Sequence, residues 1–372
     1  SIVITPMARK TQKGKETGTF AKIIIGASWT SVLLLWACSA SVMVNPTHFR
    51  LLSILGLAFP FLLGGTLFMA FLSLIFTPRQ LWITLLGLLV CIVPIRTYCP
   101  FNLSSPAPKG SLKVISYNTA GWGGAINDTI NGITGNRIAR YLANQNPDII
   151  CVQEGFAREE HYQNYIYPIF REQRYHQEDT FNDSKLVLFS KYPIVRSERI
   201  CQIGNNGTMA YWRKLSDKDT LLGINNHLRS MGLTQDDRAE FHNSVRETGE
   251  KIHKKAVRTI ISKISRASIG RAAMVDTITA FIAQQKGQSM IVCGDVNDSP
   301  ISNTYYRMSK RLRDAYVRTG NGLGRSFNRD AIIVRIDYLF CSDDWRPFSA
   351  YIDNRVNFSD HYPIIGYFKR ER

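Results

Sequence analysis

The sequence predicts a protein in two parts. An all-α transmembrane region of about three helices is followed by an α/β domain, built as a two-sheet sandwich with helices outside it. Two observations carry this prediction. The first hundred residues contain long apolar runs without a charge, and the remainder mixes strand-like apolar runs with helical patterns. The chain has 372 residues, enough for one large domain and such a region.

Two of the apolar runs are long enough to cross a bilayer. Residues 23–44 and residues 51–76 contain no charged residue, and each exceeds the ~20 residues that a spanning helix needs. A third run, residues 81–95, reaches that length only when residues 96–98 are added. A re-entrant or interfacial helix is the alternative for this third segment. The predicted spans are residues 22–44, 51–76 and 81–98.

Positive charge is concentrated at the beginning of the chain. Five Lys or Arg residues lie at or before the start of the first span, against the single acid Glu16, whereas the next two loops carry only Arg50 and Arg79. Because cytoplasmic flanks are enriched in Lys and Arg, segment 1–20 is predicted to be cytoplasmic. Three crossings then make a multi-pass integral membrane protein with an extracytoplasmic α/β domain. Two crossings would leave that domain in the cytoplasm.

The composition restricts the partners only broadly. The net charge is +17, and part of it belongs to the domain after residue 110. A moderately basic domain favours anionic partners such as phosphate esters, nucleic acid or lipid headgroups, without choosing among them. The seven Cys have no metal or disulfide spacing. Cys151, Cys293 and Cys341 lie in apolar runs and are predicted to be buried, and free thiols argue mildly against an oxidising compartment.

The second part begins after a linker. Residues 100–110 are rich in Pro and Ser, and residues 111–372 form the predicted domain. A helix is expected at residues 137–144 and another at residues 272–284. The expected strands cover residues 112–117, 149–153, 186–190, 221–225, 290–293, 336–341 and 364–368.

Polar side chains follow six of these strands. Asn118, Glu154 and His227 each come at or after a strand end in the first half of the domain. Three later segments carry the rest of the set: Gly294-Asp295-Val296-Asn297, Arg335-Ile336-Asp337-Tyr338 and Ser359-Asp360-His361. Carboxylates, amides and imidazoles gathered at strand ends can hold a divalent metal and activate water.

As an ordered set, these segments resemble the endonuclease/exonuclease/phosphatase superfamily. That superfamily includes DNase I, the apurinic endonucleases, neutral sphingomyelinases and inositol polyphosphate 5-phosphatases. The resemblance covers roughly residues 110–370. It implies a DNase I-like two-sheet α/β sandwich and hydrolysis of phosphate esters by water. The cofactor it implies is Mg²⁺, with Mn²⁺ as a substitute.

The resemblance also assigns roles near the expected reaction. His361 is expected to be the general base, and Asp337 to orient it and stabilise its imidazolium. Asp295 is expected to orient or deprotonate the water, and Asn297 to contact the phosphate. His227 is expected to donate a hydrogen bond to a phosphate oxygen or to the leaving group.

The remaining candidates concern the metal and the substrate. Glu154 is a hard oxygen ligand of the kind that Mg²⁺ prefers. Asn118 and Asp360 are expected beside it, Asp360 because it points away from His361 on an extended segment. Three further residues are candidate substrate contacts: Arg229, Arg335 and Ser326.

The substrate stays open at this point. A lipid or inositol phosphate headgroup is the first candidate, and DNA or RNA is the alternative. A membrane-tethered binding domain without activity is a third, and the intact polar set argues against it. The partners expected are a phosphate-ester substrate and the lipid bilayer, and no protein partner can be inferred. A basic helical stretch around residues 246–266 is either a solvated face or a surface for membrane or polyanion.

Overall fold

We describe the protein from a computed structural model, which describes residues 18–232, 250–329 and 334–371. The chain divides into two compact units. One unit contains residues up to Ala37 together with Pro60–Cys91. The other contains Cys38–Phe59 together with Ile92–Arg372. The division therefore runs through the predicted membrane region and not at the linker 100–110.

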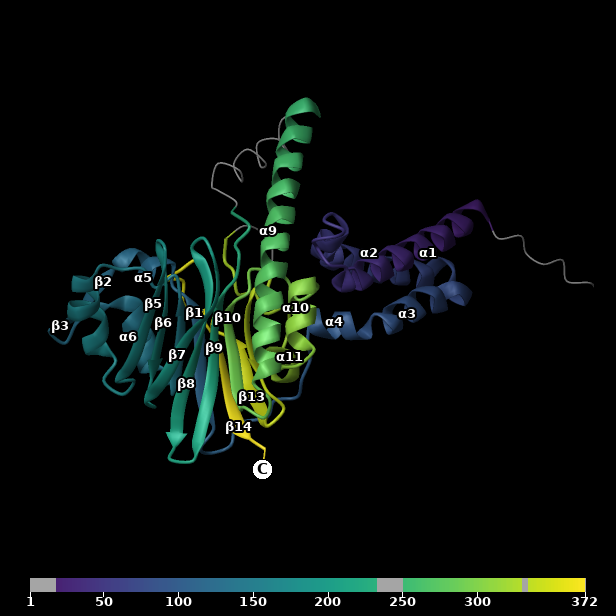
Figure 1. The fold of residues 1–372 in the computed structure, drawn as a ribbon. Coiled ribbons are helices and arrows are strands. Elements are labelled where there is room, and N and C mark those ends of the chain that lie inside the picture. Colours follow the sequence, from purple (N-terminus) through teal and green to yellow (C-terminus); the bar gives the residue numbers. More distant parts are fainter. Residues whose placement is uncertain (1–17, 233–249, 330–333, 372) are drawn as a thin grey trace, which may run out of the picture. The chain divides into compact units, whose positions relative to one another are not determined.

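The second unit is built around two six-stranded sheets (Figure 1). The strand order is β13-β14-β1-β4-β6-β5 in one sheet and β11-β12-β10-β9-β8-β7 in the other. The first sheet comprises β1 (Leu112–Asn118), β4 (Ile149–Gln153), β5 (Tyr175–Phe181), β6 (Ser184–Ser190), β13 (Trp345–Ile352) and β14 (Ile364–Arg370). The second comprises β7 (Ile194–Ile203), β8 (Asn206–Ser216), β9 (Asp219–His227), β10 (Met290–Asp295), β11 (Arg313–Asp314) and β12 (Asp337–Cys341).

The main core lies between the two sheets. Val114 and Leu188 of the first sheet are fully buried in the same cluster as Leu221 and Leu339 of the second. Alternate residues of a strand point to opposite faces, and the central strands bury both. Their outer faces need a second covering layer, which explains why the central strands are apolar almost throughout.

Helices supply that covering layer. They are α6 (Arg137–Asn144) on the first sheet and α9 (Glu250–Gln284) on the second (Figure 1). Ile138 and Leu142 of α6 pack on the first sheet. Asn136 caps the start of α6, because its side chain accepts hydrogen bonds from two backbone N–H groups of the first turn. Smaller elements are α5 (Ala120–Ala125), β2 (Asn127–Ile130), β3 (Ile133–Asn136), α7 (Glu159–His161), α10 (Asn303–Ser309) and α11 (Ala315–Thr319).

The predicted two-sheet α/β sandwich is confirmed, as are the helix at residues 137–144 and the strands of both sheet centres. Strands β5, β7, β8 and β13 were not predicted. Much of β5 and β7 is half-buried or exposed, so these strands lack the continuous apolar run that identifies a central strand.

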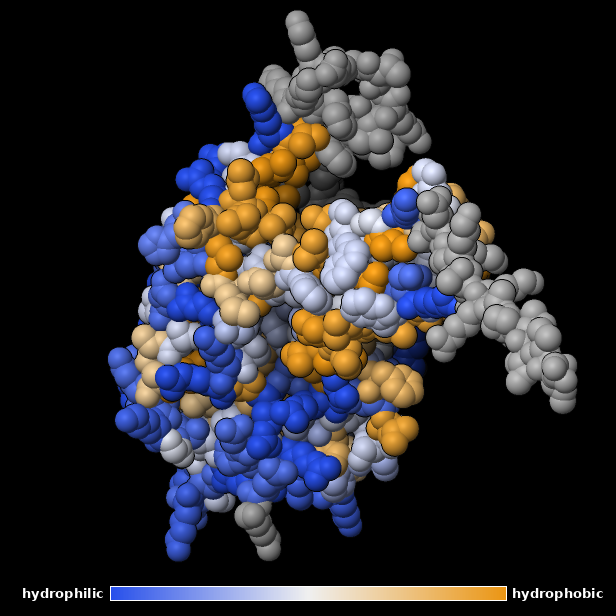
Figure 2. Space-filling view, turned by 90° about the vertical axis from the view of Figure 1, so that its right-hand side faces the viewer, coloured by the Kyte–Doolittle hydropathy of each residue, from blue (hydrophilic) through white to orange (hydrophobic). Residues whose placement is uncertain are grey.

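The first unit is a bundle of apolar helices. These are α1 (Thr19–Ala40), α2 (Phe59–Phe76) and α3 (Leu81–Val90), joined by short 3₁₀ turns that include η3 (Pro78–Gln80). Among the described residues, two helices are long and apolar enough to cross a membrane, or three if α3 and the following α4 (Ile92–Tyr98), bent by 61°, count as one span. Many of their large apolar side chains are exposed, and Figure 2 shows such residues gathered in patches on one face.

Contacts inside this bundle give the direction of each helix. The ring of Phe20 meets that of Phe76, and Ser31 O accepts a hydrogen bond from Thr66, so α1 and α2 run antiparallel. The ring of Trp29 meets that of Trp82, while Trp36 donates to the carbonyl of Gly87, so α1 and α3 run parallel. Along the chain, the three helices therefore alternate in direction: up, down, up.

Two segments next to these helices belong to the second unit. The residues between α1 and α2 form η1 (Ser41–Met43) and η2 (Leu52–Ala58). Asn303 of α10 donates a hydrogen bond to Val42 O at 2.8 Å, and a Cβ atom on Gly56 would lie only 1.7 Å from Ile301 O. The carbonyl of Thr97 in α4 accepts from Arg335 at 3.0 Å. Both segments thus pack on the α/β sandwich.

Candidate active site

The polar residues lie at one end of the central strands of both sheets. β1 is parallel to β4, and β9 is parallel to β10, so within each pair the carboxyl ends meet at one edge. The register pairs Asp295 with His227 on one side and with Asp337 on the other. In the first sheet it pairs Asn118 with Gln153. Strand pairing alone therefore gathers residues that are far apart in the sequence.

Local backbone geometry aims these side chains. Gly294 precedes Asp295 with φ of 129°, and a Cβ there would lie 2.0 Å from Asn226 O, so only glycine lets β10 approach β9 this closely. Glu154 and Asn297 have φ of 49° and 55°. Left-handed backbone in residues other than glycine concentrates at functional sites.

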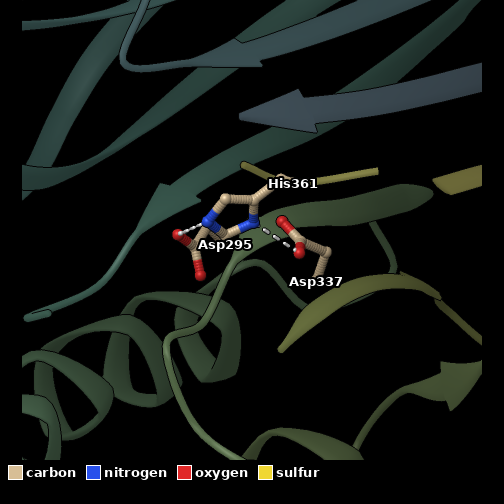
Figure 3. Close-up of side chains that lie close together, drawn as sticks. All are labelled: Asp295, Asp337 and His361. Atoms are coloured by element: carbon tan, nitrogen blue, oxygen red, sulfur yellow. Dashed lines mark hydrogen bonds and ion pairs between the residues drawn. The ribbon is translucent and has the colours of Figure 1, made fainter. Parts of the chain in front are cut away.

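His361 is held by a buried carboxylate. Its Nδ1 lies 2.8 Å from Asp337 Oδ2 (Figure 3), and both side chains are nearly inaccessible to solvent. Asp337 is fixed in turn by Ser326, whose Oγ accepts the backbone N–H groups of Ile336 and Asp337 at 2.9 and 3.1 Å. With Nδ1 engaged, the free nitrogen Nε2 faces the interior of the site.

Asp295 lies opposite that nitrogen. His361 Nε2 is 3.7 Å from Asp295 Oδ2, the same oxygen that accepts a hydrogen bond from Asn118 Nδ2 at 3.1 Å. Burial raises the pKa of Asp295 to about 6, with the charge of His361 opposing and that of Asp337 adding to the rise. Burial alone would lower the pKa of His361, but the charges of Asp337 and Asp295 raise it to about 10. An imidazole between two carboxylates is thus held as the imidazolium.

Glu154 forms the more open side of the site. Its Oε1 lies 3.3 Å from His227 Nε2 and accepts a hydrogen bond from Asn118 at 3.1 Å, yet 42% of the side chain is exposed. Burial would raise the pKa of Glu154, but these bonds and the charges of His227 and His361 lower it to about 2. Burial lowers the pKa of His227, and Glu154 and Asp295 together raise it above its ordinary value.

The donor set fits a hard divalent cation. In the part of the chain that the structure describes, one candidate group combines Asp295, Asp337 and His361, with donor atoms within 4.8 Å of one another. Asp337 Oδ1 is buried there without a hydrogen-bond partner. The His361–Asp337 bond occupies Nδ1, whereas the carboxylate of Glu154, beside Asn118, is accessible to solvent. Carboxylate and amide oxygens are what Mg²⁺ and Mn²⁺ prefer.

A cavity of about 530 Å³ opens beside Asp360. One wall is α5, whose residues 120–125 all have positive φ between 45° and 69°, a left-handed turn directly after β1. Ser359 ties this wall to the site, because its Oγ donates to Asn118 O at 2.8 Å. The cavity is lined largely by peptide, amide and hydroxyl groups, including those of Asn328, Arg329, Asn357 and Tyr362.

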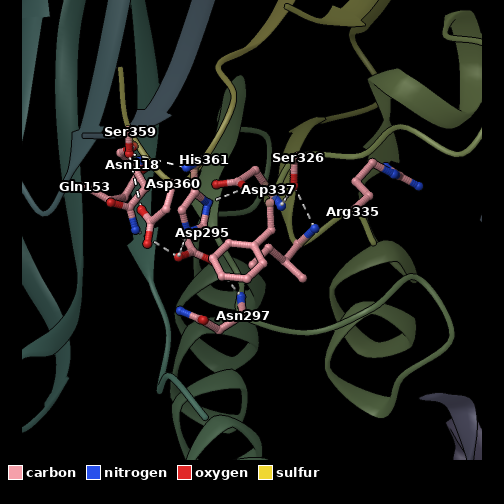
Figure 4. Close-up of polar contacts among 12 residues, drawn as sticks. Asn118, Gln153, Asp295, Asn297, Ser326, Arg335, Asp337, Ser359, Asp360 and His361 are labelled. Carbon is pink, nitrogen blue, oxygen red and sulfur yellow. Dashed lines mark hydrogen bonds and ion pairs between the residues drawn. The ribbon is translucent and has the colours of Figure 1, made fainter. Parts of the chain in front are cut away.

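Two of the predicted substrate contacts are corrected by the structure. Arg335 is fully buried, pairs with Asp314 at 2.7 Å and points away from His361 (Figure 4). Its position behind β12 makes it a structural cation. Ser326 is also fully buried and orients the backbone of Asp337, so it does not reach the cavity. Arg229 is exposed and follows β9 two residues after His227.

The structure gathers seven of the other predicted residues, Asp295 among them, at one site and places Asn297 next to Asp295. Asn297 donates its backbone N–H to Asp295 Oδ1 and its side-chain amide to Leu228 O, so it shapes the loop after β10. Figure 4 shows Asn118, Ser359 and Asp360 on one side of His361, and Asp337 and Ser326 on the other. The seven are Asn118, Glu154, His227, Asp295, Asp337, Asp360 and His361.

Sequence reasoning missed the residues that support this set. Asn206 Nδ2 lies 3.2 Å from His227 Nε2. Gln153 joins the two sheets by a 2.6 Å hydrogen bond to Asn225. The turn signal Gly204-Asn205-Asn206-Gly207 between β7 and β8 marks a hairpin, but nothing in it places Asn206 beside a histidine.

Comparisons with known proteins identify the family of the chain. Residues 122–361 match the model of the Endonuclease/Exonuclease/phosphatase family, and residues 21–98 match a domain of unknown function, DUF8431. None of the curated proteins matches the chain.

Among solved structures, the human Nocturnin catalytic domain is 17% identical (TM-score 0.46; 73% of this chain and 96% of that one). Sphingomyelinase C from Streptomyces griseocarneus is 16% identical (TM-score 0.46; 70% and 99%). A family protein from Leptotrichia buccalis is 15% identical (TM-score 0.47; 69% and 99%). The family model spans well over half of the sequence, and the chain belongs to the endonuclease/exonuclease/phosphatase family.

Proposed function

We propose that the protein is a membrane-anchored, Mg²⁺-dependent phosphoesterase that hydrolyses phosphate esters by attack of water, with Mn²⁺ as a substitute cation. The observation that carries this proposal is the buried His361–Asp337 pair facing Asp295. Family membership supports the same class of enzyme. A catalytically inactive binding domain would not need these buried charges.

The chain's own residues can perform each part of the reaction. A water between His361 Nε2 and the Asp295 carboxylate can give up its proton to Asp295. Asp337 holds the imidazolium of His361 in the orientation in which its Nε2–H can donate a hydrogen bond at that place. His227 is placed to donate to a phosphoryl oxygen or to the leaving group. Asn118 contributes a neutral amide that adds no repulsion to an anionic substrate.

The proposed cation belongs on the Glu154 side of the site. Glu154 and Asn118 would hold it, with Asp360 as a further oxygen at the rim. When bound, it polarises the phosphoryl group and neutralises charge that develops there.

The cavity beside Asp360 favours a lipid or inositol phosphate headgroup as the substrate. Amide, hydroxyl and peptide groups suit a polyol, and Arg329 suits its phosphate. The ring of Phe358 meets Tyr141 and the guanidinium of Arg137, so it is not a free platform for a nucleobase. A nuclease acting on DNA or RNA is the second candidate, supported by the basic charge of the domain.

The direction of the helices supports three membrane crossings. The up, down, up order puts the end of α3 and the end of α1 at the same end of the bundle. Val42, after α1, and Thr97, after α3, both pack on the α/β sandwich. This is expected if α2 and α3 form a hairpin that leaves the sandwich side of the membrane and returns to that same side. Together with the positive N-terminal segment, this makes a multi-pass protein with an extracytoplasmic catalytic domain the proposal we favour.

The full-length protein in lipid nanodiscs tests the function. We expect Mg²⁺-dependent hydrolysis of an aryl phosphodiester, loss of activity in EDTA, and recovery with Mn²⁺. Phosphoinositides and sphingomyelin should be turned over faster than plasmid DNA or RNA. Full activity in EDTA would exclude the mechanism, and cleavage of DNA without release of phosphate or headgroup from lipids would favour the nuclease.

A further inference from the structure

Helix α9 is longer than the sheet that it covers. It runs for 35 residues, and its N-terminal half extends past the strand ends in Figure 1. Met274, Val275 and Ile278 in its C-terminal half are buried against β8, β9 and β10. Among the described side chains before residue 265, none is fully buried. Burial on the sandwich therefore explains only half of the helix.

The middle of α9 touches the segment that leads into α2. Ser53 and Leu57 of η2 line a small hollow together with Ile264 and Ser268 of α9. η2 continues without a break into α2, which begins at Phe59. If α2 crosses the bilayer, as the proposed function requires, then this part of α9 lies at the membrane surface.

The N-terminal half of α9 has the composition of an interfacial helix. At 100° per residue, Val257, Ile261 and Ile264 lie on the same side as Ser268, which contacts η2. Ile261 is 36% exposed. Arg258 and Arg266 are also exposed. The sequence adds Lys251, Lys254 and Lys255 at the helix start, and it has no acidic residue from there to Val275.

We propose that the N-terminal half of α9 lies on the bilayer and binds anionic lipid headgroups. An apolar stripe continuous with the membrane-proximal segment, whose charged neighbours are all basic, is the pattern of a helix at a lipid interface. This inference rests on the proposed membrane anchoring. The helix would hold the catalytic domain at the surface, where a headgroup substrate is found.

Hydrogen exchange of the full-length protein in nanodiscs tests the proposal. Backbone amides of residues 257–266 should exchange about tenfold or more slowly in nanodiscs containing phosphatidylglycerol than in pure phosphatidylcholine. The double variant R258Q/R266Q should lose this difference, and I261S should weaken it without changing charge. The matched control K214Q/K218Q removes two exposed bases from the β8–β9 hairpin and should retain it.

The outcomes separate the two proposals. Equal protection in both lipids and in detergent would overturn the interfacial role and point to a cover formed by another protein segment. Failure of the protein to remain in nanodiscs would overturn the anchoring and this inference together. Hydrolysis of a soluble aryl phosphodiester should be the same for R258Q/R266Q and wild type, since neither base belongs to the active site. A loss of DNA binding in R258Q/R266Q without any lipid effect would assign the surface to nucleic acid instead.

Discussion

At the scale of single residues, the site combines groups that are costly to bury with partners that make their burial tolerable. Asp295 and Asp337 are both about 1% exposed. Each has a donor within hydrogen-bond distance, Asn118 for the first and His361 for the second. Removing one member therefore leaves a buried charge without its partner, and this is what the first predictions exploit.

Asp337→Asn should lower kcat by about 10² or more, because the amide can neither stabilise the imidazolium of His361 nor hold its ring in the same orientation. Steady-state hydrolysis of an aryl phosphodiester measures this effect. The matched control is Asp343→Asn, whose carboxylate is largely exposed. A kcat within twofold of wild type in Asp337→Asn would remove the pair from the mechanism.

Glu154→Gln should raise the Mg²⁺ concentration needed for half-maximal activity by about tenfold or more, since a neutral amide is a weaker ligand for a hard cation. A metal titration of the activity checks this directly. Glu172→Gln, at an exposed position, should titrate like wild type. An unchanged titration in Glu154→Gln would place the cation on other residues.

Arg335→Met should destabilise the protein by about 3–5 kcal/mol, because Asp314 is left buried without its cation. Chemical denaturation measures the loss. The double variant R335M/D314N removes both charges, keeps an oxygen for the two backbone N–H groups that Asp314 caps at the start of α11, and should recover much of the stability. If Arg335 bound substrate, KM would rise in both variants. We expect the KM of the double variant to equal that of the wild type.

At the scale of elements, the segments beside the apolar helices are built to pack on the sandwich. η2 can approach Ile301, just before α10, only because Gly56 lacks a side chain. The side-chain amide of Asn303 in α10 donates a hydrogen bond to the backbone carbonyl of Val42 in η1, which fixes the neighbouring turn. These contacts involve residues more than 200 positions apart, which is why the sequence shows only an apolar run there.

Gly56→Val should loosen this packing, since its side chain would collide with Ile301 O. We expect faster proteolysis between residues 41 and 58 and a lower melting temperature. Gly64→Val is the matched control, because a Cβ at Gly64 meets no atom within 4 Å. Equal protease resistance of the two variants would mean that η2 does not dock on the sandwich.

At the scale of the whole molecule, the number of crossings decides where the catalytic domain works. Reporters inserted at residues 45–48 and at the C-terminus should lie on one side of the membrane. A reporter at residues 78–80 should lie on the other side, together with the N-terminus. Compartment-specific activity of each fusion checks this arrangement. A C-terminal reporter on the side of residues 78–80 would mean that α3 and α4 do not cross.

The sequence by itself determined the α/β sandwich and most of its site. Apolar runs identify the central strands because these are buried on both faces, and the polar residue ending each run marks the shared edge. His361, Asp337, Asp295 and Glu154 were found in this way, before any contact was known. The roles expected for them are predictions that the proposed experiments address.

Only the tertiary structure decided which polar residues face the site and which support it. Arg335 and Ser326 lie within a few residues of Asp337 and have suitable chemistry, yet both are buried behind it. Sequence spacing cannot distinguish the two faces of a segment whose partners, such as Asp314, come from elsewhere in the chain. Two further features that only the tertiary structure decides are the left-handed turn at residues 120–125 and the packing of η2. They depend on contacts between distant segments, and these contacts form only when the sheets are assembled.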